Sequence, residues 1–399
     1  NKIPQFFKDT GKKHLEYKIY KNTEFLPFGS TKNGEHIENV KLGCNSFVAD
    51  SNFSNNSDIF FSIPYSKFWK ANIDGKKTEI KLAKTAFMEL PVQKGNHHIE
   101  LSYTNTYFTS GIIVTVIAFF VFLILNVKNK KFIEKDFSEV IEKYKNVNNK
   151  TSDLSKESSS NNIWVFWWQG YEAAPLLVKK CIDSIIKNAG NHPVILITKE
   201  NWKNYTDIPD YIIEKVEKGI VSLTHFSDIL RMALISKNGG LWLDATIFVS
   251  KEIPEYCFEL TYFSIHYETL TSRIAKGKWT GFCQAGQKKS IIHSFCRDIF
   301  FSYWKKYNKL IDYFFIDYIM LAGYNNIPAF KKLVDGLPLN NQGIKELDKH
   351  FNDEYSEEYL NNILLQSIFF KLNWKREYKK EVNGKNTIYG HFLEKQCYL

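Results

Sequence analysis

A long apolar run in the first third of the chain dominates its hydrophobic pattern. Residues 101–127 contain no charged side chain, and residues 107–127 read YFTSGIIVTVIAFFVFLILNV. At about 1.5 Å per residue, a helix of this length is roughly 30 Å long, which matches the core of a bilayer. The alternative is a buried core helix, but such a helix usually carries polar residues along one side. The pattern therefore predicts one transmembrane helix over 107–127.

The charges around this run indicate its orientation. Lysines stand at 128, 130 and 131, directly after the run, whereas the nearest upstream lysine or arginine is Lys94. Lysine and arginine accumulate on the cytoplasmic side of membrane helices. We therefore expect the residues after the run to be cytoplasmic and those before it to be extracytoplasmic.

The part before the run, residues 1–105, has the pattern of a small all-β module. Its signals are the strand 59–63, the Asp-Gly turn within 72–77 and the strand 97–103. His97 and His98 are adjacent, so they point to opposite faces of that last strand. We therefore do not expect them to share a metal ion.

The part after the run, residues 128–161, is predicted to connect the membrane helix to a further domain. Residues 132–145 mix charged and apolar positions and predict a short juxtamembrane helix. Residues 146–162 read NVNNKTSDLSKESSSNN, which is polar, lacks aromatic residues and is typical of a flexible linker. The interpretation is a tethered domain over 162–399.

Within 162–399, apolar strands alternate with amphipathic helices. The predicted strands are 163–168, 193–198 and the one that holds Asp244, and the predicted helices are 175–188, 211–218 and the one that holds Asp228. This βαβα order predicts an α/β domain with an open, mostly parallel sheet. Aromatic-rich helices are predicted at 291–307, 313–324 and 355–368, where the acceptor side of a site would be built.

Composition narrows the classes of function. The chain has 399 residues, a net charge of +10, 44% hydrophobic and 16% aromatic residues, enough for two or more packed domains. The lysines are scattered and form no stripe, so we expect no nucleic acid, and anionic lipid or nucleotide phosphate is the better partner. The six cysteines form no C-x-x-C pair, which disfavours zinc and a disulfide framework. Since the chain begins with Asn, we expect it to be the tail of a longer protein.

The candidate chemistry lies in two neighbouring motifs, Ser-Asp-Ile-Leu-Arg at 227–231 and Gly-Gly-Leu-Trp-Leu-Asp-Ala-Thr at 239–246. Asp228 and Arg231 are one helical turn apart and share a face. Apolar residues on both sides of Asp244 predict a buried strand that contains one acid, which needs a metal ion or a hydroxyl group. The alternatives are an ordinary ion pair on a solvated helix and an acid that caps a turn.

These motifs resemble the glycosyltransferases of family 32 and, more closely, bacterial capsular polysaccharide synthesis proteins; the glucosyltransferase domain of large clostridial toxins is a more distant resemblance. Those families read S-D-x-x-R and then G-G-x-[WY]-x-D-x-D. The resemblance implies a GT-A-like fold in which Asp228 and Arg231 hold the donor sugar. It also implies that Gly240 belongs to the donor site and that Asp244 is the first acid of a metal-binding DxD motif. Thr246 stands where the second acid would be.

Further residues match the same families. Trp168, Gln169 and Gly170 match the W-x-G after the first strand, whose aromatic ring stacks on the nucleotide base. Asp317 lies in a D-Y-x-x-x-D-Y segment and is a candidate for positioning the acceptor hydroxyl, with a structural hydrogen bond as the alternative. The resemblance makes His391 a weak candidate metal ligand. Lys371 is a candidate for neutralising phosphate or an ordinary surface lysine.

Residues 20–130 resemble the carboxyl-terminal end of YfhO-type bacterial membrane proteins, which are linked to the transfer of sugars onto cell-envelope polymers. The matching segments read IPYSKFWKANIDGKK and KGNHHIELSYTN, followed by the membrane run. The many membrane helices that carry activity in those proteins are not part of this chain.

The sequence as a whole predicts a membrane-tethered glycosyltransferase with a cytoplasmic catalytic domain. It would move a hexose from a UDP-sugar to a capsular or other polysaccharide precursor or a lipid-linked glycan. The resemblance implies retention of configuration and a divalent ion, Mn²⁺ or Mg²⁺. Because of Thr246, one alternative is a catalytically degenerate subunit that binds a sugar nucleotide or a glycan. A third interpretation makes the β module a carbohydrate-binding or scaffold domain.

Overall fold

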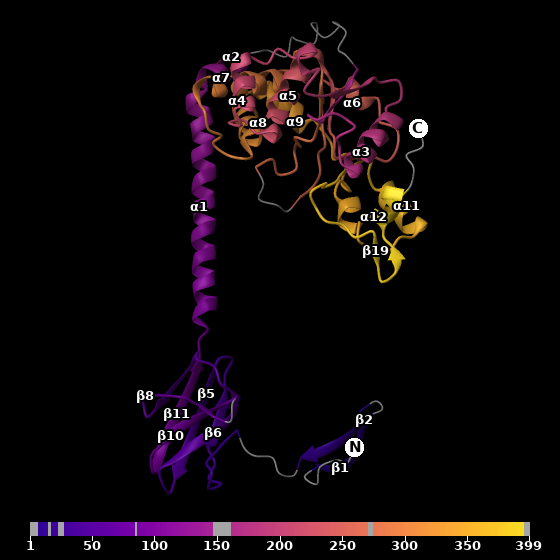
Figure 1. Cartoon of the computed structure of the whole chain (residues 1–399). Coiled ribbons are helices and arrows are strands. Elements are labelled where there is room, and N and C mark those ends of the chain that lie inside the picture. The colour runs from indigo at the N-terminus through magenta and orange to yellow at the C-terminus, as the bar shows by residue number, and fades with distance from the viewer. Residues whose placement is uncertain are drawn as a thin grey trace. The chain divides into compact units, whose positions relative to one another are not determined.

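The structure is a computed structural model that divides into two compact units, residues 1–122 and 123–399 (Figure 1). It describes residues 7–14, 17–22, 28–83, 86–146, 161–269 and 274–394. Most of the predicted flexible linker, residues 147–160, lies outside the described residues.

The first unit contains two antiparallel sheets that enclose one apolar core. Their strand orders are β3-β6-β10-β9 and β4-β5-β11-β7-β8. Alternate residues of β5 and β10 are buried, and Phe47, Ile59, Leu90 and Leu101 meet in the core. The strands are β3 (Gly29–Ser30), β4 (Glu38–Leu42), β5 (Ser46–Phe53), β6 (Ser57–Pro64), β7 (Trp69–Ile73), β8 (Lys76–Thr78), β9 (Lys81–Ala83), β10 (Phe87–Val92) and β11 (Gly95–Tyr103), with a separate hairpin of β1 (Phe7–His14) and β2 (Tyr17–Asn22).

The Asp-Gly turn expected from the sequence joins β7 to β8. Asp74 and Gly75 both have positive φ, 50° and 77°, as a two-residue hairpin turn of this kind requires. His97 Nδ1 lies 2.6 Å from Asp74 Oδ2, and His98 Nδ1 lies 2.8 Å from Asp50 Oδ1. The two histidines therefore contact different carboxylates.

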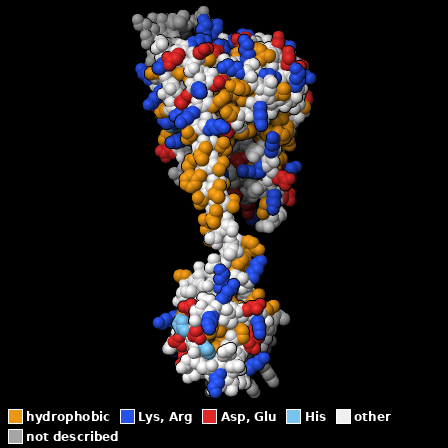
Figure 2. All heavy atoms as spheres, turned by 90° about the vertical axis from the view of Figure 1, so that its left-hand side faces the viewer, with side chains coloured by type: hydrophobic (Ala, Val, Ile, Leu, Met, Phe, Trp, Pro, Cys, Tyr) orange, Lys and Arg blue, Asp and Glu red, His pale blue; other side chains and the backbone are white. Residues whose placement is uncertain are grey.

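Helix α1 (Thr106–Asp136) contains the whole apolar run and continues beyond it. Of the helices in the described ranges, it is the one that is long and apolar enough to cross a membrane, and none of its most apolar window is buried. Figure 2 shows hydrophobic side chains over its visible face. A helix with this surface has no polar face to turn toward water, which agrees with the predicted span.

The end of α1 and helix α2 (Ser138–Lys145) pack into the second unit. Ile133, Phe137 and Ile141 are buried in its core. The second compact unit begins at Leu123, so it contains these helices as well as residues 162–399, for which the sequence predicts a separate domain. The reason is that the segment interpreted as a free juxtamembrane helix is amphipathic and buries its apolar side.

Polar contacts also hold α2 against α7 (Ile291–Lys306). Asp298 of α7 accepts hydrogen bonds from Tyr144 Oη at 2.8 Å and from Lys143 Nζ at 2.7 Å. At the end of α1, Asn129 donates to Asp312 Oδ2 at 3.2 Å. These contacts hold residues 129–144 within the second unit.

The second unit is built on a five-stranded sheet with the order β13-β12-β14-β17-β16. Strand β12 pairs in parallel with β13 and β14, whereas β17 pairs antiparallel with β14 and β16. Four of the five strands therefore run in one direction, and β17 makes the sheet mixed. The strands are β12 (Ile163–Phe166), β13 (Val194–Ile197), β14 (Gly240–Asp244), β16 (Tyr262–Ser264) and β17 (Cys283–Gly286).

Both faces of this sheet are covered by helices, as expected of an α/β domain. Trp164 and Trp242 project toward α5 (Leu223–Asn238), α7 and α8 (Phe315–Asn326) and belong to one core. The alternate residues, such as Val165 and Leu243, belong to a second core with α3 (Leu176–Lys187).

The strand expected on both sides of Asp244 is in fact two strands in different sheets. Strand β14 ends at Asp244, a turn follows at Ala245 and Thr246, and β15 (Ile247–Val249) pairs antiparallel with β18 (Phe369–Lys371). The turn redirects the chain, so the carboxylate lies at a strand end. The remaining elements are α4 (Asp210–Glu217), α6 (Tyr256–Glu259), α9 (Pro328–Asp335), α10 (Glu346–His350), α11 (Glu357–Leu365), α12 (Ile388–Glu394), β19 (Glu381–Val382), β20 (Lys385–Asn386) and the 3₁₀ turn η2 (Trp202–Asn204).

The docked end of α1 and α2 leads to a stability prediction. A fragment of residues 162–399 lacks these helices and exposes the core that Ile133, Phe137 and Ile141 cover. Burial of each such side chain contributes about 1.5–3 kcal/mol. We expect this fragment to melt on the order of 10 °C below a fragment of residues 128–399, measured by circular dichroism.

A point variant provides the control for this comparison. Phe137→Ala in the 128–399 fragment should lose about 3–5 kcal/mol, because it leaves a cavity in the same core. Equal melting temperatures for the two fragments would contradict the assigned start of the unit.

Candidate active site

Helix α5 presents the first two site residues. It begins after Ser222, whose Oγ accepts the backbone N–H of His225 at 3.2 Å, and it ends at Gly239, whose φ is 78°. Within it, Arg231 Nη1 lies 2.9 Å from Asp228 Oδ1. The side chain of Arg231 is only 6% exposed, so this pair is buried and is not the solvated ion pair considered as the alternative.

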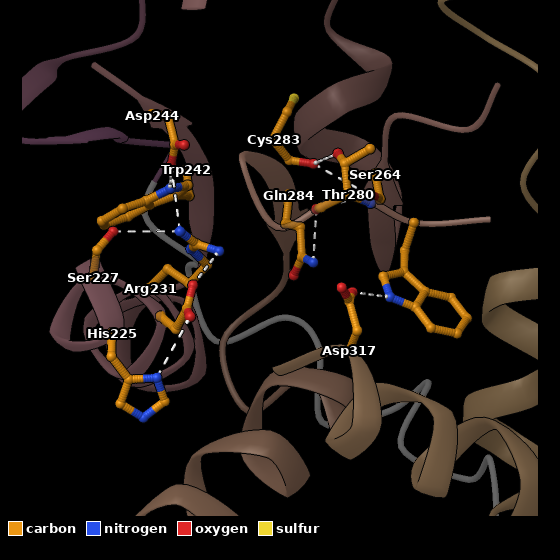
Figure 3. A network of polar contacts seen from close by, with 12 residues as sticks. His225, Ser227, Arg231, Trp242, Asp244, Ser264, Thr280, Cys283, Gln284 and Asp317 are labelled. Carbon is orange, nitrogen blue, oxygen red and sulfur yellow. Dashed lines mark hydrogen bonds and ion pairs between the residues drawn. The ribbon is translucent and has the colours of Figure 1, made fainter. Parts of the chain in front are cut away.

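Strand β14 brings Asp244 to the same guanidinium group. Arg231 Nη2 lies 3.3 Å from Asp244 Oδ1, and it also donates to Ser227 Oγ at 3.3 Å. Trp242, two residues before Asp244 on the same strand face, donates its Nε1–H to Asp244 Oδ1 at 2.9 Å. The Trp242 ring also lies 5.2 Å from the guanidinium carbon, within reach of a cation–π interaction. Figure 3 shows this network.

Gly281 lies beside Arg231, and because it has no side chain it leaves room for the guanidinium group. A Cβ atom on Gly281 would lie 2.5 Å from Arg231 Nη1, which is closer than real contacts allow. The guanidinium can therefore keep its contact with Asp228 only beside a residue without a side chain.

The surroundings of Asp228 and Asp244 give these two carboxyl groups different pKa values. Burial raises the pKa of Asp228 to about 7, and the charges of Asp244 and Asp317 act in the same direction against Arg231. Burial would also raise the pKa of Asp244, but the Lys371 and Arg231 cations outweigh it and hold that pKa below its usual value. Asp244 is therefore ionised at neutral pH, whereas Asp228 gains or loses its proton close to neutral pH.

His225 lies one helical turn before Asp228 on α5. Burial lowers the pKa of His225 to about 4, so its ring is neutral at pH 7. Trp304 donates to His225 Nε2 at 3.1 Å, which leaves the ring hydrogen on Nδ1, 3.7 Å from Asp228 Oδ2.

Lys371 is the second cation that contacts Asp244. Its Nζ lies 2.8 Å from Asp244 Oδ2 and 2.5 Å from Thr246 Oγ1. The sequence left Lys371 open between a phosphate contact and a surface lysine. The structure brings it into the site, because β18 pairs with β15 immediately after Thr246.

Asp317 and Gln284 lie across from the Arg231 network in Figure 3. Asp317 on α8 accepts the Nε1–H of Trp279 at 2.9 Å. Gln284 on β17 is fully buried and donates to the Thr280 carbonyl, while its Oε1 has no hydrogen-bond partner in the structure. Figure 3 shows both side chains facing the Arg231 side of the network. A buried amide oxygen with this orientation is suited to accept a substrate hydroxyl group.

The W-x-G segment lies directly after β12, next to α5. Trp168 is half-buried, and its ring contacts Phe226 of α5 at 5.7 Å. Gln169 is exposed and Gly170 has a φ of 81°. The segment therefore neighbours the helix that holds Asp228.

Gly240 lies elsewhere. It begins β14, whereas Asp244 ends it, and the four steps of strand between them span about 13 Å. The role of Gly240 in the donor site stays a prediction.

His391 lies on α12 and contacts a residue outside that helix. Its ring stacks on Tyr355 with centroids 3.8 Å apart, and its backbone N–H donates to the Thr387 carbonyl. These contacts explain its position without a metal ion, and its role as a ligand stays a prediction.

The donor set does not fit a divalent ion held by two acids. Both oxygens of Asp244 already accept from cations or from Trp242, and Thr246 contributes a hydroxyl that Lys371 contacts. Within the described ranges, no three His, Cys, Asp or Glu side chains come together as a candidate metal site. Hard divalent ions prefer several carboxylate or phosphate oxygens, which these residues do not supply.

The sequence indicated most of the site but missed several supporting residues. Trp242, Trp279 and Gln284 received no role. Gln284 has the same signal that revealed Asp244, a polar residue within a short apolar strand. Trp279 has no such signal, because its contact with Asp317 joins a loop to a helix that is distant in the sequence.

Comparison with known families identifies both parts of the chain. Residues 124–392 match the family described as capsular polysaccharide synthesis protein. This match covers about two thirds of the chain and spans every candidate site residue. Residues 29–115 match the family described as bacterial membrane protein YfhO.

Curated relatives match shorter segments. The chain is 32% identical over 84 residues to "Uncharacterized protein YfhO" of Bacillus subtilis (strain 168), covering 21% of this chain and 10% of that protein. It is 26% identical over 110 residues to "O-glycosyltransferase braB" of Annulohypoxylon truncatum, covering 25% of this chain and 26% of that protein. The chain thus spans about a tenth and a quarter of the length of these relatives.

Two solved structures are similar at a low level. "PaToxG Glycosyltransferase" is 16% identical with a TM-score of 0.29, and the match covers 61% of this chain and 96% of that one. The WbbM bifunctional glycosyltransferase is 11% identical with a TM-score of 0.31, covering 59% and 49%. TM-scores of this size carry no argument about the site.

The buried ion pair predicts a measurable loss of stability. Asp228→Ala leaves the Arg231 guanidinium with one carboxylate fewer, and breaking a buried pair costs about 3–5 kcal/mol. We expect a clear fall in the melting temperature of the full chain in detergent at pH 8, where Asp228 is ionised.

The matched control is Glu214→Ala on α4. Its pair with Lys218 is 3.4 Å long, but the two side chains are 62% and 66% exposed, so the loss should stay below about 1 kcal/mol. Equal losses in the two variants would show that Arg231 does not depend on Asp228.

Proposed function

The chain belongs to the family of capsular polysaccharide synthesis proteins, and from that premise we propose that it is a glycosyltransferase. It moves a hexose from a nucleotide sugar, specifically a UDP-sugar, to a hydroxyl group of a capsular or other surface polysaccharide precursor. The observation that carries this proposal is the meeting of Asp228, Arg231 and Asp244 at the carboxyl end of β14. Ligands of open α/β sheets bind at that edge.

In this proposal the donor lies between α5 and the wall formed by Gln284 and Asp317. Arg231 and Asp228 hold hydroxyl groups of the sugar, since a guanidinium fork and a carboxylate together offer donors and acceptors in fixed directions. Trp168 stacks on the base. The domain acts as a GT-A-type transferase.

The acceptor side is assigned to Asp317. Its carboxylate is held by Trp279 and faces the network, so it can accept a hydrogen bond from the incoming hydroxyl group. The departing diphosphate develops negative charge, and the cations around Asp244 stabilise that charge. We propose that the anomeric configuration of the sugar is retained, as the resemblance to family 32 implies.

We further propose a cell-membrane location with α1 as the span. The transferase domain is cytoplasmic, where nucleotide sugars are available, and the β module of the first unit is extracytoplasmic. The acceptor is a polysaccharide or a lipid-linked glycan at the membrane surface.

The second candidate function is a subunit that binds a sugar nucleotide or a glycan without turnover. The observation that favours it is Thr246, which removes one acid from the motif. The two functions differ in whether UDP is released.

Donor turnover provides the test. The full chain in detergent, supplied with a panel of nucleotide sugars, should release UDP from one of them. Arg231→Lys should lose most of this turnover, on the order of 100-fold, because lysine cannot copy the forked contact with two carboxylates. The variant should still melt cooperatively.

Two results would count against the enzyme. Saturable nucleotide binding without UDP release favours the binding subunit. Near-normal turnover of Arg231→Lys returns Asp228 and Arg231 to a purely structural ion pair.

The topology is tested independently. A reporter fused after Lys145 should behave as cytoplasmic, and one inserted before Thr106 as external, because the lysines follow the span. The reverse labelling pattern would reject a cytoplasmic transferase domain.

A further inference from the structure

We propose that Lys371 is the built-in cation of the donor site, and that it binds the diphosphate of the nucleotide sugar in place of a divalent metal ion. This inference rests on the proposed function and names the partner of one residue within that same site. It makes donor binding independent of metal.

The first argument is position. Asp244 and Thr246 are the first and third positions of the segment that the sequence aligns with a DxD motif. Here Lys371 Nζ contacts the side chains of those same two residues, at 2.8 Å from Asp244 Oδ2 and 2.5 Å from Thr246 Oγ1. An ammonium group therefore lies where the two motif side chains converge.

The second argument is rigidity. Lys371 belongs to β18, which pairs with β15 in the register Ile247 with Lys371. The next residue, Leu372, donates its N–H to the Thr246 carbonyl at 2.9 Å. Main-chain pairing thus fixes the base of the lysine, and its side chain is only 28% exposed. A surface lysine that turns to water would have neither constraint.

The third argument is charge. Arg231 contacts the carboxyl groups of both Asp228 and Asp244, and Lys371 contacts Asp244 as well. Asp244 therefore already has two cations beside it before any ion binds. A divalent ion at Asp244 would lie within a few ångströms of two cations, and Coulomb repulsion between like charges at that distance is large in a partly buried site.

The fourth argument is the capacity of the ammonium group. Lysine has three N–H donors, and the contacts with Asp244 and Thr246 account for two of them. The third can donate to a phosphate oxygen. In this way Lys371 binds the leaving group directly and neutralises the charge that develops there.

The replacement of the second acid by Thr246 follows from the same arrangement. A carboxylate at 246 would add a negative charge next to Lys371 and would compete with the diphosphate for it. A hydroxyl group holds the ammonium in place without neutralising it.

The test measures nucleotide binding by calorimetry on the full chain in detergent, with UDP as the probe. In EDTA, UDP should bind the unaltered chain, and added Mn²⁺ should change the affinity less than threefold. Lys371→Met should weaken binding at least tenfold, and Lys371→Arg should recover most of it, since it keeps the charge. Lys375→Met, four residues later on an exposed segment, is the matched control and should bind as the unaltered chain does.

A double variant probes the exchange of cations. Thr246→Asp combined with Lys371→Ala supplies a second acid and removes the lysine, so its UDP binding should depend on Mn²⁺. Melting temperatures of all variants are compared, so that a loss of binding in a folded chain is separated from unfolding.

The outcomes separate the two proposals. Binding of UDP only when Mn²⁺ is present, or unchanged binding by Lys371→Met, overturns the lysine as the cation and leaves the transferase standing. Tight Mn²⁺ binding without nucleotide that Asp244→Asn abolishes also overturns it. Failure to bind any nucleotide sugar, with or without metal, overturns the proposed function and this inference together.

Discussion

The guanidinium group of Arg231 is a full charge inside the domain, and the geometry of the site depends on neutralising it. An unpaired buried charge of this kind costs several kcal/mol. Asp228 on the same helix supplies one partner and Asp244 on β14 supplies the other, so α5 and β14 cannot slide past each other without breaking a contact. The ring of Trp242 and the space beside Gly281 complete the enclosure. A requirement for charge balance therefore sets the edge of the sheet at which a ligand can bind.

Local patterns in the sequence predicted what depends on local structure. The spacing of Asp228 and Arg231 is a property of one helix, and Asp244 stands out within one apolar strand, so both were recognised. Lys371 was left open because its place depends on two three-residue strands separated by more than a hundred residues. The packing of the juxtamembrane segment was not predicted for a similar reason: its mixed pattern indicated a helix over 132–145 but not the surface on which that helix packs.

Helix α1 has a different relation to the domain from the one that a flexible linker implies. It extends without a break from the apolar run to Asp136, and its last turns lie in the core beside α7 (Figure 1). The segment with linker composition follows α2 in the sequence, so it does not separate α1 from α2. The end of the helix that carries the apolar surface is thus part of the packing of the second unit.

The contact between Lys371 and Thr246 has a consequence for how such sites change during evolution. A single substitution to Asp at 246 would create a carboxylate that the lysine neutralises, and a single loss of the lysine would leave Asp244 with one cation fewer. On the proposal that Lys371 binds the diphosphate, each single change weakens the cation offered to the donor, so the two positions are expected to covary among homologous chains although they are 125 residues apart. Whether such a site uses a metal ion from solution or a lysine side chain of its own would then be inherited through the pair of residues at 246 and 371.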